Sequence, residues 1–137
     1  MATPVRSVVR VLPDGTALHN RLLAALPARD YARILKHLQM VPVTTGRTLQ
    51  EPGATVTDVY FPNGGVFSVT NEMRNGALVE VATVGLEGML GIGVFLGDRA
   101  GAGRTFQQVP DGLLPSMTVR RFVKESAKAG QIGRAHV

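Results

Sequence analysis

The stretch that decides the fold is VYFPNGGVFSVTNEMRNGALVEVATV, residues 59–84. It consists of short runs rich in β-branched and aromatic residues, separated by the turn segments Asn63-Gly64-Gly65 and Arg74-Asn75-Gly76. An Asn-Gly pair between two β-prone runs is the strongest short hairpin signal, because both residues tolerate the positive φ angles of tight hairpin turns. We therefore predict an antiparallel strand meander over these residues.

The same pattern continues on both sides of the meander. VPV (41–43) and RTLQ (47–50) precede it, each followed by turn residues, and TFQQV (105–109) follows it and leads into Pro110-Asp111-Gly112. The chain thus predicts about eight short strands.

Helical patterns flank these strands. On the amino-terminal side Asn20 is a candidate N-cap for NRLLAAL (20–26), and Pro27 is placed to open a second helix. The apolar face of this second helix has the spacing i, i+3, i+4, i+7, given by Tyr31, Ile34, Leu35 and Leu38.

On the carboxyl-terminal side we predict a helix beyond Leu114, with Ser116 as its cap. Its apolar face is formed by Val119, Phe122, Val123 and Ser126, and its basic face by Arg120, Arg121, Lys124 and Lys128. The expected fold class is therefore mainly β with flanking helices, an antiparallel β-roll or jelly roll.

Composition and charge restrict the function classes. The 137 residues suffice for one domain with a real core, and the absence of cysteine excludes disulfides, thiol catalysis and cysteine-based zinc sites. No run of about 18 apolar residues and no apolar signal core occurs, so we expect a cytoplasmic protein without a membrane span. The net charge is +5, with an acidic middle and basic ends, and scattered arginines on helices are most simply a solvated surface.

A glycine-rich, apolar segment, VGLEGMLGIGVFLG, occupies residues 84–97. Its glycines suit either a backbone cradle for a phosphate or the tight turns of a β-roll. The spacing of Gly91, Gly93 and Gly97 is one residue too long for the dinucleotide-binding fingerprint, and no lysine stands where a phosphate-binding loop of the Walker type needs one.

Taken in order, these pieces resemble the sensor domain of the Crp-Fnr family of bacterial transcription regulators. The resemblance covers residues 19–127 and is carried by NRLL, by the EPG turn (51–53), by VYF and the Gly-Gly pair after it, and by the glycine-rich turn followed by the pair Arg104-Thr105. It implies a β-roll of the cyclic-nucleotide-binding type, a long dimerisation helix after it, and then a winged helix-turn-helix that binds DNA.

The resemblance also implies a ligand site. Arg104 matches the arginine that neutralises the cyclic phosphate, Thr105 the small hydroxyl residue beside it, and Gly91 and Gly93 the turn that lets the backbone approach the ligand. The acidic residue that usually grips the ribose is missing, since Gly91 or Ile92 stands there. Losing such a charge-assisted hydrogen bond costs about 1.5–3 kcal/mol. The expected effector is a cyclic nucleotide or another small anion, and the alternative is that the glycines only make turns while Arg104 pairs with a surface acid.

The sequence gives little indication of a metal site or a catalytic site. The three histidines form no H-x-H pair, His37 falls opposite the apolar stripe of its helix and is expected to face solvent, and Asp58, Glu80 and Glu87 are expected to be exposed strand acids. We therefore predict no metal site and no enzyme activity. A cupin-like enzyme and a stand-alone β-roll interaction module remain as alternatives to the sensor.

The expected organisation has three parts. Residues 1–18 are predicted to be a flexible leader, 19–127 the β-roll with its helices, and 128–137 a tail. QIGRAHV (131–137) corresponds to the start of a common sequencing adapter in translation, so we expect a gene fragment that lacks the helix-turn-helix. On this interpretation DNA is read only through the missing domain, and the intact protein is a homodimer.

Overall fold

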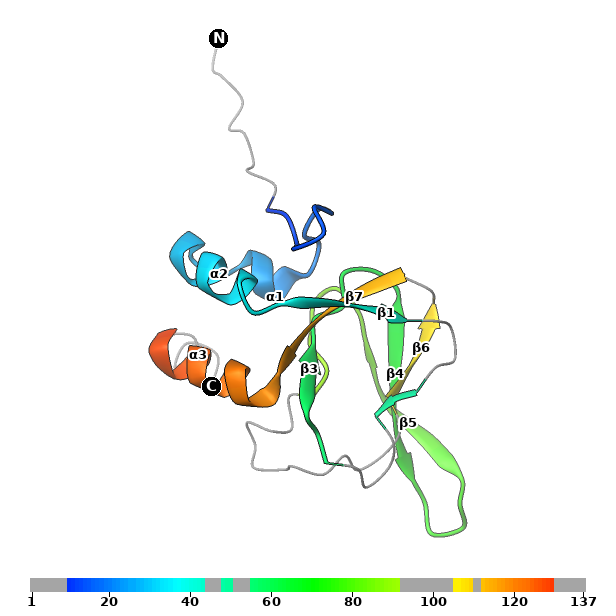
Figure 1. Ribbon diagram of the computed structural model, residues 1–137. Coiled ribbons are helices and arrows are strands. Elements are labelled where there is room, and N and C mark those ends of the chain that lie inside the picture. The colour runs from blue at the N-terminus through cyan, green and yellow to red at the C-terminus, as the bar shows by residue number, and fades with distance from the viewer. Residues whose placement is uncertain (1–9, 44–47, 51–54, 92–104, 110–111, 130–137) are drawn as a thin grey trace.

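The computed structural model describes residues 10–43, 48–50, 55–91, 105–109 and 112–129 (Figure 1). These residues form a mainly antiparallel β structure with helices on one side. In chain order the elements are α1 (Arg21–Ala24), α2 (Ala28–Leu35), β1 (Gln39–Val43), β2 (Thr48–Gln50), β3 (Asp58–Tyr60), β4 (Val66–Glu72), β5 (Leu78–Val84), β6 (Thr105–Val109), β7 (Gly112–Thr118) and α3 (Val119–Ala129).

The strands form two sheets. One has the order β1-β7-β3 and the other β2-β6-β4-β5, and every neighbouring pair is antiparallel. The predicted fold class, mainly β with flanking helices in a β-roll, is confirmed. No helix in the described ranges is long and apolar enough to cross a membrane.

Two hydrophobic clusters lie on opposite faces of the three-stranded sheet. The cluster between the sheets contains Val43, Phe67, Leu90 and Leu114, and the partly buried Tyr60 packs against it. The cluster between this sheet and the helices is larger and contains Leu12, Leu18, Leu23, Leu26, Tyr31, Ile34, Leu38, Val59, Phe61, Met89, Met117 and Phe122. Val59 and Tyr60, which are consecutive in β3, thus pack in different clusters, because successive side chains of a strand point to opposite faces.

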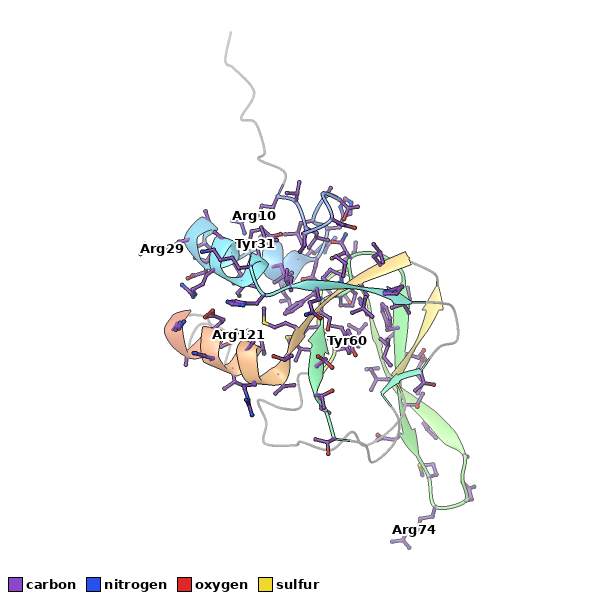
Figure 2. All side chains as sticks on the ribbon, viewed as in Figure 1. Arg10, Arg29, Tyr31, Tyr60, Arg74 and Arg121 are labelled. Carbon is purple, nitrogen blue, oxygen red and sulfur yellow. The ribbon has the colours of Figure 1, made fainter. Side chains whose placement is uncertain are left out.

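The hairpin predicted at Arg74-Asn75-Gly76 is confirmed and joins β4 to β5. The Gly76 N–H donates to Met73 O, Met73 N–H donates to Ala77 O, and Gly76 has a φ of +86°. This is a three-residue hairpin loop that ends in a left-handed glycine. Figure 2 shows Arg74 at its tip, far from the helices.

The prediction of a flexible leader is wrong for residues 10–18. Val11 bridges Ala17 around a turn with Gly15 at φ +88°, and Leu12 and Leu18 are buried in the helical cluster. Arg10 Nη1 donates to Leu23 O at 3.0 Å, and its guanidinium lies 5.0 Å from the centre of the Tyr31 ring (Figure 2). Pro13 and Gly15 lie in a tight turn, and the leucines on either side of it are buried against the helix pair.

The cap predicted for the last helix is also wrong. Ser116 lies inside β7, opposite Gln39 of β1 and Tyr60 of β3. Thr118 is the residue that caps α3, because its Oγ1 accepts the Arg121 N–H at 3.2 Å. Pairing with a strand on each side outweighs the local capping preference of Ser116, so the strand continues past it.

Candidate functional site

The sequence predicts a site at Gly91, Gly93, Arg104 and Thr105. Gly91 is the last described residue of its segment, whereas Gly93 and Arg104 lie outside the described residues. Thr105 begins β6, where its backbone pairs with Gln50 of β2 and Val69 of β4. The structure therefore gives the two ends of the predicted site: the approach to the glycine-rich loop and the first residue of the strand after it.

Gly91 packs tightly against β3. Leu90 and Tyr60 exchange backbone hydrogen bonds of 2.9 and 3.1 Å, so the chain arrives at Gly91 beside the strand. Gly91 has a φ of +89°, and a Cβ atom there would lie 2.9 Å from Asp58 O and 3.2 Å from Val59 Cγ1. Glycine is thus required for the turn and for the approach of the loop to β3.

The segment before Gly91 is tied to the amino-terminal helices. Asn20 is completely buried, and its side-chain amide donates to Pro62 O at 2.8 Å and to Gly88 O at 2.9 Å. Its Oδ1 accepts the Leu23 N–H at 3.1 Å, which confirms the predicted N-cap of α1. The Arg21 N–H donates to Leu86 O at 2.7 Å. One asparagine therefore holds together α1, the segment just after β3 and the approach to the glycine-rich loop.

Strand β3 also contacts the start of α3. Asp58 pairs with Thr118, the cap of α3, and the Val119 N–H donates to Thr57 O at 2.9 Å. The part of β3 that contacts Gly91 is thus hydrogen-bonded to the residues at the start of α3.

A buried carboxylate that the sequence analysis missed joins α3 to α2. The Glu125 side chain is 1% exposed, and its oxygens lie 3.2 Å from His37 Nε2, 3.5 Å from Arg33 Nε and 3.6 Å from Lys128 Nζ. Arg33 also pairs with Asp30 at 3.1 Å. His37 is therefore engaged by Glu125, and the expectation that it faces solvent is wrong.

A sequence signal for this carboxylate did exist. Glu125 follows the buried Phe122 by one helical turn, so it lies on the face of α3 that packs against the protein. Phe122 stacks edge-to-face on Phe61, with ring centres 6.0 Å apart. Val123, which was predicted to belong to the apolar face, is 45% exposed.

Comparison with solved structures identifies the fold. The chain superposes on the N-terminal domain of a transcriptional regulator from Streptomyces coelicolor A3(2), with a TM-score of 0.67, 17% identity, and coverage of 85% of this chain and 84% of that one. It also superposes on the sensor domain of the transcriptional regulator DNR from Pseudomonas aeruginosa, with a TM-score of 0.71, 12% identity, and coverage of 83% and 76%. The chain has the cyclic-nucleotide-binding β-roll fold.

A third neighbour of the β-roll is the c-di-GMP responsive global regulator CLP from Xanthomonas campestris, with a TM-score of 0.64 and 18% identity. The match covers 80% of this chain but only 55% of that protein, so the β-roll spans about half of its length. No family model matches the sequence, and no curated protein matches it significantly. The predicted resemblance to Crp-Fnr sensor domains is confirmed in the fold.

Three described acidic residues of the β-roll, Asp58, Glu80 and Glu87, have separate hydrogen-bond partners. Ser68 Oγ donates to Glu80 Oε1 at 2.5 Å, Thr57 Oγ1 donates to Asp58 Oδ2 at 2.9 Å, and the Gly85 N–H donates to Glu87 Oε1 at 3.2 Å. These contacts place the three carboxylates on different partners rather than on one another. In the part of the chain that the structure describes, no group of three or more His, Asp or Glu side chains could hold a metal ion.

Proposed function

We propose that this β-roll is the ligand-sensing domain of a Crp-Fnr-type transcription regulator. Its effector is a small anion of the cyclic-nucleotide class, held by the backbone at Gly91 and Gly93 and by the side chains of Arg104 and Thr105. The domain is not an enzyme. It works in the cytoplasm, as part of a homodimer whose DNA contacts belong to a separate domain beyond α3.

The observation that carries this proposal is the double role of β3. Tyr60 and Asp58 of this strand contact the start of the glycine-rich loop. Asp58, together with Thr57 just before the strand, contacts the start of α3. A ligand that orders the loop would change the packing of Gly91 on β3. Because Val119, the first residue of α3, donates its N–H to Thr57 O, and Thr118, the cap of α3, pairs with Asp58, the helix would respond.

The structural neighbours support the same function. Two are described as domains of transcriptional regulators, one of them explicitly as a sensor domain, and the third as responsive to c-di-GMP. These effectors and activities belong to those proteins. For the present chain they suggest a panel that includes both cyclic mononucleotides and a cyclic dinucleotide.

The test is a titration of the ¹⁵N-labelled chain with cyclic AMP, cyclic GMP and c-di-GMP, followed by amide NMR spectra. We expect saturable shifts for Gly91 and, through β3, for Val119 and Arg121 with at least one of these ligands. Arg104→Gln should weaken that binding by about tenfold or more, since it removes a charged donor to the phosphate.

The matched control is Arg74→Gln, which makes the same charge change at the hairpin tip and should leave the affinity unaltered. Absence of saturable binding for the whole panel, or equal weakening by the two variants, would contradict the proposed function.

A further inference from the structure

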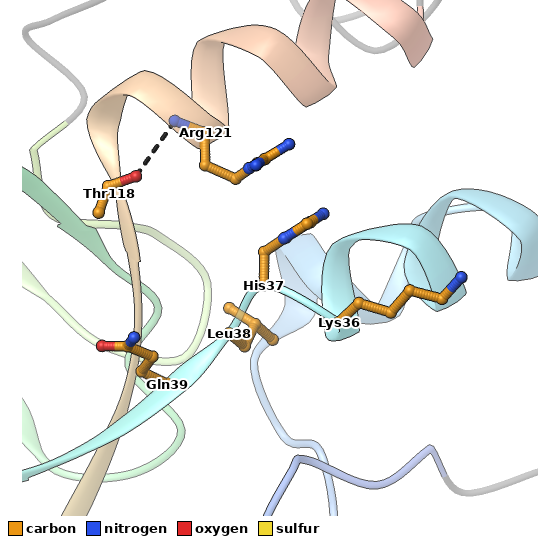
Figure 3. A pocket seen from close by; sticks show the side chains of 6 residues that line it. All are labelled: Lys36, His37, Leu38, Gln39, Thr118 and Arg121. Atoms are coloured by element: carbon orange, nitrogen blue, oxygen red, sulfur yellow. Dashed lines mark hydrogen bonds between the residues drawn. The ribbon is translucent and has the colours of Figure 1, made fainter.

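A hollow separates the end of α2 from the start of α3. Its volume is about 270 Å³, and its lining comes from the turn between α2 and β1 and from the junction of β7 with α3. The lining residues are Lys36, His37, Leu38, Gln39, Thr118 and Arg121 (Figure 3). The hollow is smaller than an ordinary drug-binding pocket, which suits a small inorganic or monoester anion.

The charges around this hollow are unbalanced. Three of its six lining residues carry basic groups and none carries a carboxylate. Figure 3 shows the Arg121 and His37 side chains extending beside each other, from opposite walls, while Lys36 extends from the end of α2. Among the described residues, no carboxylate is recorded within salt-bridge distance of Arg121, whereas Arg33, His37 and Lys128 share Glu125.

Glu125 also fixes the orientation of the imidazole. Its Oε1 lies 3.2 Å from His37 Nε2, so the Nε2 edge of the ring faces the buried carboxylate and Nδ1 remains for another partner. A protonated histidine donates from both ring nitrogens. With both ring nitrogens protonated, His37 can bind Glu125 through one nitrogen and an anion in the hollow through the other.

We infer that this hollow is a second anion site, specific for a phosphate group, and that it is distinct from the predicted effector site. Arg121 is the principal ligand, because a guanidinium binds two phosphate oxygens at once. His37 Nδ1 donates from the opposite wall, and Lys36 contributes its charge from the rim. Arg121 also lies in the first turn of α3, where the helix dipole favours an anion.

Such an anion would bridge two elements that meet at this point. It would hold the end of α2 to the start of α3, beside the existing contact of Glu125 with His37. The site thus couples phosphate concentration to the position of α3, independently of the glycine-rich loop.

The experiment is a titration of the full chain with inorganic phosphate at constant ionic strength, followed by the His37 ring resonances and the Arg121 amide. We expect saturable shifts, and we expect Arg121→Gln to weaken binding by about tenfold or more while Arg121→Lys weakens it less. Arg120→Gln is the control. It makes the same charge change on the preceding residue of α3, which is exposed, and it should leave the affinity unaltered. Lys36→Gln, on an exposed side chain, should weaken binding by a smaller factor.

The titration is repeated with glycerol 3-phosphate, a phosphate monoester. Whichever of the two ligands binds with the higher affinity identifies the source of the phosphate group, a monoester or the free ion. Non-saturating shifts like those produced by sodium chloride, or equal weakening by Arg121→Gln and Arg120→Gln, would overturn the site. The titration is repeated on the Arg104→Gln protein, which should bind phosphate normally. Failure of the cyclic-nucleotide proposal is thereby separated from failure of this one.

Discussion

Glu125 Oε1 lies 3.2 Å from His37 Nε2, and this contact joins α3 to the turn that follows α2. The carboxylate is 1% exposed, whereas the side chains of its partners Arg33, His37 and Lys128 are 26%, 30% and 51% exposed. A buried charge depends on its partners, because without them the cost of removing it from water is not offset. Glu125 therefore holds α3 against α2 only while these basic partners remain in place.

The first prediction concerns this carboxylate. Glu125→Gln should lower the free energy of unfolding by about 1–3 kcal/mol, less than for a completely buried ion pair because its partners retain access to water. Urea denaturation measures the change. Glu87→Gln removes a charge from an exposed residue whose carbonyl can still accept the Gly85 N–H, and it should stay within about 0.5 kcal/mol of the unchanged protein. Equal effects of the two substitutions would show that burial of Glu125 is unimportant.

The second prediction separates backbone strain from steric conflict at two glycines. Gly91 and Gly76 have φ angles of +89° and +86°, but a Cβ at Gly91 would meet Asp58 O at 2.9 Å while one at Gly76 would meet nothing within 4 Å. Gly76→Ala should cost about 1–2 kcal/mol from the left-handed backbone alone. Gly91→Ala should cost about 1–3 kcal/mol more, since the new methyl group displaces β3. Thermal and urea unfolding of the two variants test this order, which fails if Gly76→Ala is the more damaging.

The third prediction concerns Asn20. Asn20→Ala removes the N-cap of α1 and the donors to Pro62 O and Gly88 O, and should cost about 2–4 kcal/mol. Asn75→Ala removes one exposed contact, from the Ala77 N–H to Asn75 Oδ1, and should cost less than about 1 kcal/mol. Hydrogen exchange should also show faster exchange of the Leu23 amide in the Asn20 variant. An unchanged Leu23 exchange rate would contradict the assigned cap.

The fourth prediction is a pH dependence at Asp14. The Thr16 hydroxyl donates to its Oδ1 at 2.6 Å and the Thr16 N–H at 3.1 Å, and these hydrogen bonds lower the pKa of the Asp14 carboxyl below its ordinary value of 3.8. A lowered folded-state pKa means that the stabilisation is present above the unfolded-state pKa and is lost as the pH falls through the folded-state pKa. The loss is therefore confined to acid pH, below about 4.

Thr16→Val removes the larger of these contributions, the side-chain hydrogen bond, and should move the Asp14 pKa toward 3.8. A carboxyl-carbon NMR titration measures the shift directly. Thr57→Val is the control, since it removes a hydroxyl next to a different aspartate, and it should leave the Asp14 pKa unchanged. An Asp14 titration that is identical in the Thr16 variant would exclude the hydroxyl as the cause.

Local features of the fold were predictable because they depend on neighbours in the sequence. The Asn20 cap, the hairpin at Asn75-Gly76 and most strands follow from turn chemistry and from alternating β-prone residues. The site was predicted only as a resemblance. The structure places Gly91 against β3, while the roles of Gly93, Arg104 and the Thr105 side chain remain predictions.

Errors arose where distant segments decide the local structure. Ser116 has the residue type of a helix cap, yet strands on both sides of β7 keep it extended. Leu12 and Leu18 flank a turn that looks like a loose terminus, yet both are buried against the helix pair. Local propensity is worth tenths of a kcal/mol to about 1 kcal/mol per residue, so pairing and burial readily override it.

By itself, the amino-acid sequence determined the cap of α1 at Asn20, the hairpin between β4 and β5, and most of the strands, and hence the mainly β fold class, since each of these features is encoded within a few residues. It did not reveal β7, because Ser116 has the residue type of a helix cap. Only the tertiary structure decided which polar groups meet. Asn20 and Gly88, and likewise Glu125 and His37, are brought together by packing across the chain, and the same packing places Arg121 and Lys36 around one hollow. The energetic effect of a buried or charged group depends on such neighbours from distant parts of the chain. No periodicity in the sequence specifies which neighbours these are.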